Sequence, residues 1–491
     1  MARRIMVQGT MSNSGKSLLV AALCRIFRND GFRVAPFKSQ NMALNSGVTA
    51  DGKEMGRAQI MQAEAARALP DVRMNPVLLK PNSESGSQVI VDGEVLCSMS
   101  AKDYFSYRKE LMPRIMESFE SLSEENDIIV IEGAGSPAEI NLKENDIVNM
   151  GLAEMLDAPV LLVGDIDRGG VFAQLYGTVM LLTERERARI KGFIINKFRG
   201  DPTLLDPGIK EIEEKTGIPV VGVVPYIPDL KLEDEDSLTE RFNRFPNPDA
   251  IIKIAVIRLP RISNFSDFDP FDQNNDVSVY YTTDPNALEE ADLIMIPGSK
   301  NTIADMHFLK DKGIADALQK LTGKIPIFGI CGGLQMLGGS IEDPENTESG
   351  GSIQGLGLLP IKTTLHPEKH QTRTKGRLYK DIKGILASLS DLEYEGYEIH
   401  VGVSSMQDSS RLPNLISTEK DIYGTYIHGL FDTAEITMTV LNSLAAKKAV
   451  FLDTTSQINQ RPYRALQYDH LAKTLRSHLN MNVIHSLISY S

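Results

Sequence analysis

Residues 5–17 read IMVQGTMSNSGKS, and this stretch decides the fold of the first half of the chain. The mostly apolar residues 5–8 predict a short buried strand, and the amphipathic pattern over residues 18–27 predicts a helix. The glycine-rich segment between them ends in GKS at the start of that helix. A strand, such a loop and a helix in this order are typical of a phosphate-binding loop, here a variant lengthened by one residue.

The loop predicts a binding site for ATP. Its backbone N–H groups would surround the phosphates, Lys16 would reach the β and γ oxygens, and Ser17 would hold Mg²⁺. A glycine turn before an ordinary helix is the alternative, and the GKS ending argues against it. The expected cofactor-binding residues are Gly9, Thr10, Asn13, Ser14, Gly15, Lys16, Ser17 and Asn196.

Further apolar runs separated by helical patterns predict a doubly wound α/β domain with a parallel sheet. These runs cover residues 127–131, 160–163, 192–195 and 220–224. Polar residues follow them, which places the chemistry along one edge of the sheet. Glu132 directly follows the first run, so we expect it to share the Mg²⁺ ion with the serine of the loop.

Amide and cationic side chains are dense between the loop and residue 80. Lys38, Gln40 and Asn41 follow a short predicted strand, and Asn75 and Lys80 bracket an apolar segment. Such groups suit an acidic or amide-bearing substrate. A solvated polar surface explains them equally well, and spacing alone leaves the two interpretations open.

The second half contains the stretch FGICGGLQMLG at residues 328–338. An apolar run ends on Cys331, glycines flank it, and a helical pattern follows. This is the pattern of a nucleophile elbow, with a thiol in place of a hydroxyl. The turn leaves no space for side chains around the nucleophile, and the helix N-terminus favours a thiolate that attacks carbonyl carbon.

The thiol needs a base and an oxyanion site. His428, after the strand-like residues 423–427, is the best candidate for the general base. His400 also ends a strand-like run and is the second candidate. A glycine turn at Gly298 and the N–H group of Gly332 are the expected oxyanion donors.

The composition is that of an ordinary globular protein: 491 residues, a net charge of −13 and three widely spaced cysteines. We therefore expect no nucleic-acid or membrane partner, no disulfide framework and a cytoplasmic location.

The periodicity of apolar residues fades around residues 228–249, which predicts a linker there. The predicted units are an ATP-dependent synthetase domain over 1–235, an amidotransferase domain over 250–450 and a helical segment over 451–491.

These motifs together resemble the cobyric acid synthases, and the resemblance runs from the phosphate-binding loop to the helical tail. It implies a dethiobiotin synthetase-like first domain and a class I glutamine amidotransferase-like second domain. It also implies ATP- and glutamine-dependent amidation of the b, d, e and g carboxylates of adenosylcobyrinic acid a,c-diamide, a corrinoid polycarboxylate. Each amidation would proceed through an acyl phosphate. Family precedent points to Asp146 as an active-site carboxylate.

One position departs from the wider amidotransferase pattern, in which a glutamate stands two residues after the histidine. Here that position is Leu430. His428 must then be oriented by a group from outside this motif, or Cys331 and His428 work as a dyad, and we expect the pair to be weakly organised. Two other functions stay open. One is a related amide ligase acting on the a and c positions of cobyrinic acid or on a cell-wall precursor. The other is a P-loop ATPase with a degenerate amidotransferase module.

Overall fold

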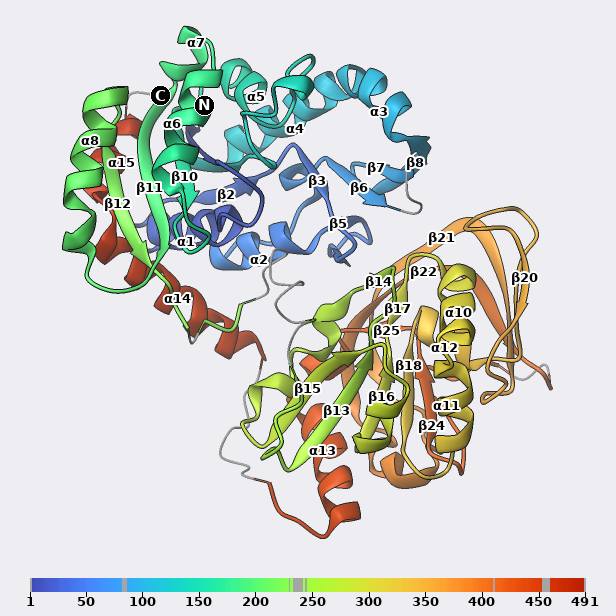
Figure 1. The fold of residues 1–491 in the computed structure, drawn as a ribbon. Helices are drawn as coiled ribbons and strands as arrows, with labels where there is room; N and C mark the ends of the chain where they lie inside the picture. The colour runs from blue at the N-terminus through green and yellow to red at the C-terminus, as the bar shows by residue number, and fades with distance from the viewer. Residues whose placement is uncertain are drawn as a thin grey trace.

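The computed structural model describes residues 2–81, 86–228, 230–232, 242, 245–408, 411–452 and 460–489. Two α/β halves follow each other along the chain, and Figure 1 shows them one above the other. Most of the predicted linker at 228–249 lies outside the described residues, as does residue 235, the predicted end of the first domain. The description below therefore starts from the sheets.

The first half is built on a six-stranded sheet in which every pair of neighbours is parallel, as the apolar runs predicted. Its central strand, β1, is the one that leads into the phosphate-binding loop. In spatial order the strands are β12 (Val220–Pro225), β11 (Ile190–Phe198), β10 (Val160–Asp165), β1 (Arg3–Gly9), β9 (Ile128–Glu132) and β2 (Val34–Phe37).

Side chains alternate across this sheet and create two apolar cores. Ile5 and Val7 of β1 belong to one core, while Met6 belongs to the other. The first core is covered by α1 (Lys16–Asn29) and part of α2 (Arg57–Ala65). The second core is covered by α4 (Met112–Glu125), α5 (Met150–Met155), α6 (Val171–Leu181) and α8 (Asp206–Thr216).

The second half repeats the same design with a sheet whose first five strands are parallel and whose edge strand β23 is antiparallel. Helices α10 (Thr302–Asp311), α11 (Ile314–Leu321), α12 (Gly332–Leu337) and α13 (Ala434–Lys448) belong to this half. In spatial order the strands are β15 (Val277–Thr282), β13 (Ile252–Ile257), β16 (Leu293–Ile296), β18 (Ile327–Ile330), β24 (Ile422–Thr425) and β23 (Ile416–Ser417).

A long antiparallel pair of strands, β21 (Ile361–Arg377) and β22 (Glu393–Met406), forms an arm that reaches from the second half to the first. The hydroxyl of Tyr397 on β22 donates to the carbonyl of Ser46 at 3.1 Å, and Gln371 on β21 donates to the carbonyl of Gly93 at 3.0 Å. The arm therefore fixes how the halves meet.

Smaller sheets of the first half receive this arm. β4 (Ser46–Val48) pairs with β5 (Glu54–Gly56). A four-stranded sheet lies beside them, with the order β3 (Gln40–Met42), β6 (Val77–Pro81), β7 (Gly86–Val91) and β8 (Glu94–Ser100). In the second half, β25 (Ile427–His428) and β22 pair within the sheet that contains the arm.

The C-terminal helices return to the first half. α14 (Gln460–His478) and α15 (Met481–Ser489) are drawn in red beside the blue and green elements of Figure 1. Arg25 of α1 holds both carboxylate oxygens of Asp469, at 2.7 and 2.9 Å. Leu471, Leu475 and Leu479, which share one helical face, lie in the core beneath α1. We infer that residues 460–489 of the predicted C-terminal segment belong structurally with the first half.

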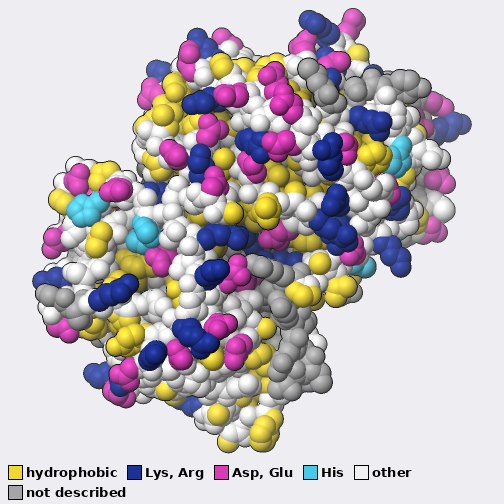
Figure 2. All heavy atoms as spheres, turned by 180° about the vertical axis from the view of Figure 1, so that it is seen from behind, with side chains coloured by type: hydrophobic (Ala, Val, Ile, Leu, Met, Phe, Trp, Pro, Cys, Tyr) yellow, Lys and Arg dark blue, Asp and Glu magenta, His cyan; other side chains and the backbone are white. Residues whose placement is uncertain are grey.

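The surface shows no segregation of charge on the face drawn in Figure 2, where basic and acidic side chains are interspersed over both halves. Among the described residues, no helix is both long and apolar enough to cross a membrane.

We predict that Ile484→Ala destabilises the first half, because this α15 side chain is 0% exposed and its loss would leave a cavity. The free energy of unfolding should fall by about 2–5 kcal/mol in urea titrations. Leu466→Ala on α14 is the control, since Leu466 is 66% exposed. It should change stability by less than about 0.5 kcal/mol. A loss in Ile484→Ala as small as that in Leu466→Ala would mean that the packing of α15 does not stabilise the first half.

Candidate active sites

Cys331 lies on the predicted elbow between β18 and α12. Its backbone has φ 54° and ψ −108°, a left-handed conformation that a residue with a side chain rarely adopts. A Cβ atom built on Gly333 would lie 2.0 Å from the carbonyl oxygen of Ile296, so only glycine fits there. The strain and the close packing hold the thiol in one place, as the elbow pattern predicted.

His428 is the histidine that the structure brings to this thiol. It is buried at the end of β25, and its ring stacks on Tyr397 with centroids 5.4 Å apart. Nδ1 lies 2.7 Å from Oδ2 of Asp267, whose Oδ1 accepts the backbone N–H of Gly429 at 2.8 Å. Asp267 therefore fixes the tautomer and orientation of the ring.

The charge of Asp267 also sets the protonation of His428. Burial alone would lower the pKa of His428, but the Asp267 carboxylate, its hydrogen bond to the ring and the neighbouring Cys331 raise it to about 10. Of the two expectations for this pair, weak organisation is wrong: a group from outside the motif completes it. Sequence reasoning missed Asp267 because it lies 161 positions away on a short 3-10 helix, Phe265–Phe268.

Leu430, at the position of the usual glutamate, is buried in the apolar core of the second half. Asp267 approaches His428 from a different element, the 3-10 helix Phe265–Phe268. The missing glutamate is thus replaced by a carboxylate from another part of the fold.

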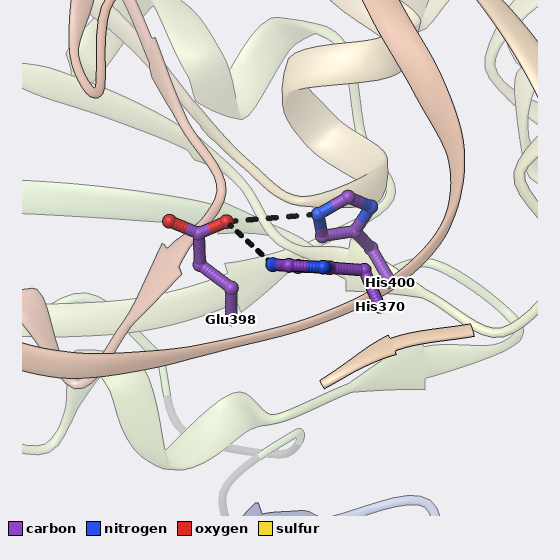
Figure 3. A group of neighbouring side chains, drawn as sticks. All are labelled: His370, Glu398 and His400. Carbon is purple, nitrogen blue, oxygen red and sulfur yellow. Dashed lines mark ion pairs between the residues drawn. The ribbon is translucent and has the colours of Figure 1, made fainter. Parts of the chain in front are cut away.

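His400, the second candidate base, has other partners. Nε2 lies 3.7 Å from Oε2 of Glu398, and Nδ1 lies 3.2 Å from the carbonyl oxygen of Gly402. Figure 3 shows the rings of His370 and His400 both directed at the Glu398 carboxylate. One ligand atom from each of these three residues lies within 4.8 Å of the others, a spacing that a metal ion could bridge. His400 also lines the cavity at Cys331, so it is close to the thiol without being paired to it.

The expected oxyanion donors also meet at the elbow. β17 (Gly298–Ser299) packs against it, and a Cβ atom built on Gly332 would lie 2.8 Å from the backbone nitrogen of Ser299. Nearby, Gln335 of α12 donates to the carbonyl of Val401 and to the hydroxyl of Tyr426, both at 3.1 Å. These bonds fix the wall of the cavity that contains the thiol.

The phosphate-binding loop adopts the expected strand–loop–helix geometry. Gly15 has φ 89°, and a Cβ atom there would lie 2.3 Å from Nδ2 of Asn196, which donates to the carbonyl of Ser14 at 2.9 Å. Lys16 donates to the carbonyl of Met11 at 3.0 Å and thus lies over the loop. Gly9 and Thr10 begin the loop at the end of β1, and Asn13 accepts a bond from Lys197 at 2.6 Å. All predicted cofactor-binding residues therefore lie together.

Two cavities adjoin the loop. One of about 390 Å³ lies beside Asn13 and Asn196, and Tyr226 and Leu471 and Leu475 of α14 contribute to its lining. The other, of about 400 Å³, contains several of the groups expected to handle phosphate and metal. Its lining includes Lys16, Ser17, Lys38, Asn41, Arg108, Glu132 and Asp146.

The predicted Mg²⁺ ligands are adjacent. The Ser17 hydroxyl donates to Oε1 of Glu132 at 2.9 Å, and Lys38 lies 2.8 Å from the same oxygen. Burial would raise the pKa of Glu132, but Lys38, Gln62 and Lys16 outweigh it and hold the pKa below its ordinary value. A hydroxyl and an ionised carboxylate are the hard oxygen donors that Mg²⁺ takes, so this pair fits the ion.

Asp146 lies in the same cavity, but its carboxylate already has partners. It accepts the backbone N–H groups of Val148, Asn149 and Gly151 at 2.9 to 3.0 Å. This carboxylate holds the loop that leads into α5.

The polar segment before residue 80 is interior. Asn41, Asn75 and Lys80 are all buried, so the interpretation as a solvated surface is wrong for them. Asn75 donates to the carbonyls of Lys38 and Val77 and accepts the backbone N–H of Gly56.

Two family models match the chain. Residues 5–239 match the CobQ/CobB/MinD/ParA nucleotide binding domain, and residues 253–436 match the CobB/CobQ-like glutamine amidotransferase domain. Several curated relatives carry the name cobyric acid synthase. That of Lachnoclostridium phytofermentans is 52% identical, covering 99% of both chains. That of Ruminiclostridium cellulolyticum is also 52% identical, covering 99% of this chain and 97% of the relative. That of Photorhabdus laumondii is 50% identical, covering 99% and 98%.

A nucleotide-binding half joined to a glutaminase half defines a class of enzyme, the ATP-dependent glutamine amidotransferases, which are amide ligases. Within that class the chain belongs to the cobyric acid synthase family of cobalamin biosynthesis. The predicted resemblance and the predicted order of the two folds are confirmed.

We predict that Asp267→Asn lowers glutamine hydrolysis by about 10²–10⁴-fold, because the asparagine amide no longer stabilises the protonated ring of His428. The loss should appear in kcat more than in KM, as measured by glutamate release. His400→Ala is the comparison variant and should be less damaging. A larger loss in His400→Ala than in Asp267→Asn would make His400 the base.

Proposed function

We propose that this enzyme amidates the b, d, e and g carboxylates of adenosylcobyrinic acid a,c-diamide, using one ATP and one glutamine for each. The observation that carries the proposal is the full-length similarity to cobyric acid synthases, with a buried Cys331–His428–Asp267 arrangement in the second half. The substrates would be ATP, glutamine and a corrinoid polycarboxylate. We further propose a cytoplasmic location, where ATP and glutamine are supplied.

In the glutaminase step, the proton of the Cys331 thiol would reside on His428, and the resulting thiolate would attack the amide carbon of glutamine. The backbone N–H groups near Ser299 and Gly332 would stabilise the oxyanion. His428, protonated at neutral pH, would donate a proton to the departing ammonia, and Asp267 would stabilise its charge. Water would then hydrolyse the thioester and release glutamate.

The synthetase step would take place at the phosphate-binding loop. A carboxylate is a poor electrophile, so transfer of the γ-phosphoryl group would first convert it to an acyl phosphate. The adenine would lie in the cavity lined by Tyr226 and α14, with Asn196 beside the loop, and the phosphates would extend to Lys16. Mg²⁺ held by Ser17 and Glu132 would neutralise phosphate charge.

In the second cavity, ammonia would attack the acyl carbon and phosphate would leave. Asp146 is proposed to act there by holding the loop that lines the cavity.

Incubation with ATP, Mg²⁺, glutamine and the a,c-diamide tests the proposed function through the mass of the product. Four amidations are expected, and an unchanged corrinoid together with amidation of another carboxylate would overturn it.

We predict that Cys331→Ser abolishes amidation with glutamine but retains amidation with ammonium salts, because the thiol serves only to release ammonia. The glutamine-dependent rate should fall by at least about 1000-fold, whereas the ammonium-dependent rate should stay within about twofold. Both rates are read from the same corrinoid product. An equal loss with the two nitrogen donors would contradict this division of labour.

We predict that Lys16→Ala lowers amidation with either nitrogen donor by at least about 100-fold, because the lysine would stabilise charge on the transferred phosphoryl group. Phosphate release and product mass measure the effect. Lys191→Ala is the comparison variant, since the exposed Lys191 donates to the carbonyl of Ala188 and lines neither of the two cavities beside the loop. Normal turnover in Lys16→Ala would place the nucleotide elsewhere.

A further inference from the structure

Two histidines and a glutamate face one another on the arm formed by β21 and β22. His370 and His400 are directly opposite in the antiparallel pair, and Glu398 lies two residues before His400 on the same face of β22. The centroids of the two rings are 5.1 Å apart, and both rings are directed at the Glu398 carboxylate (Figure 3). The three side chains therefore converge on one space beside the strands.

An interruption in the strand pairing holds one of the rings in place. Residues 365–368 of β21 lie opposite the single residue Gly402 of β22, a bulge just before His370. The carbonyl oxygen of Gly402 lies 3.2 Å from Nδ1 of His400. Because a carbonyl can only accept a hydrogen bond, Nδ1 carries the ring proton in this contact and Nε2 keeps its lone pair. Histidines that bind metals are typically oriented by such a bond.

The distances within the cluster suit a shared ion better than direct hydrogen bonds. Oε2 of Glu398 lies 3.6 Å from Nε2 of His370 and 3.7 Å from Nε2 of His400, both too long for a hydrogen bond. Zn²⁺ binds nitrogen and oxygen ligands at about 2.0–2.2 Å, so the ligands of a tetrahedral ion lie about 3.3–3.6 Å from one another. The cluster therefore needs only small side-chain shifts to hold such an ion.

The exposure and chemistry of the three ligands indicate which ion binds. The side chains of His400, Glu398 and His370 are 10%, 24% and 54% exposed, so the cluster opens to solvent on the side of His370. Water can take a fourth position there, as in zinc sites with three protein ligands. Two imidazoles favour a transition-metal ion over Mg²⁺, which prefers oxygen ligands.

We propose that His370, Glu398 and His400 form a binding site for a divalent transition-metal ion, and that Zn²⁺ is the ion whose geometry they fit. The ion joins the two strands of the arm at the edge of the thiol cavity, because His400 also lines that cavity. The carbonyl oxygen of Ile399, between two of the ligands in sequence, lies 3.6 Å from the sulfur of Cys331. The bound ion thus fixes the segment of β22 that contacts the thiol.

The test is a calorimetric titration of the full chain, without a histidine tag or nucleotide, with Zn²⁺ in the presence of excess Mg²⁺. Among the described residues, no other group of His, Cys, Asp and Glu offers three ligand atoms in such an arrangement, so we expect one site for each chain. His370→Ala and Glu398→Gln should each weaken Zn²⁺ binding by at least about tenfold, since loss of an outer-shell partner alone can cost that much.

His366→Ala is the matched control. His366 also lies on β21, is 44% exposed and pairs with one carboxylate, Glu345 at 3.1 Å, but it belongs to no such group of three. Its loss should leave the affinity for Zn²⁺ unchanged.

Cys331→Ser distinguishes the proposed site from binding at the thiol, and it should also leave the affinity unchanged. A loss in Cys331→Ser as large as that in His370→Ala would place the ion at the thiol and overturn the proposed site. Unchanged affinity in both ligand variants, or no saturable binding of Zn²⁺ by the unaltered chain, would overturn it as well. If one ligand variant does not fold, the other decides.

Discussion

Parallel pairing of strands is the constraint on which both halves depend. Because parallel strands end at the same edge of their sheet, the loop after β1, Glu132 at the end of β9 and Asn196 near the end of β11 are brought together. The same rule places Cys331 after β18, next to the turn that follows β16. Helices cover both faces of the first sheet, so polar groups gather at the edge, where chemistry can occur.

The arm formed by β21 and β22 connects the sheet edges of the two halves. It carries His400 beside the thiol, and it brings Lys369 to Glu54 of the first half, which also pairs with Lys80. A buried ion pair contributes little net stability when compared with apolar packing, yet loss of one partner leaves an uncompensated charge. The cluster of Glu54, Lys80 and Lys369 therefore specifies how the halves meet more than it stabilises them.

The C-terminal helices bring the end of the described chain back to the first half. After the second half, α14 returns to pack on α1, and its leucines Leu471 and Leu475 line the cavity beside the phosphate-binding loop. Arg464 of the same helix lies 3.1 Å from Asp432, four residues after His428. One helix thus touches the surroundings of both sites, and the ends of the described chain lie on the same half.

The sequence by itself determined the two folds, the loop from Gly9 to Ser17 and the elbow at Cys331, because each is a local pattern of strand, glycine and helix. It also predicted His428, which ends a strand. Only the tertiary structure decided that Asp267 orients His428, since no spacing rule joins residues 161 positions apart. The sequence likewise did not decide whether Asn41, Asn75 and Lys80 are buried. A polar segment has the same pattern whether water or the rest of the protein covers it.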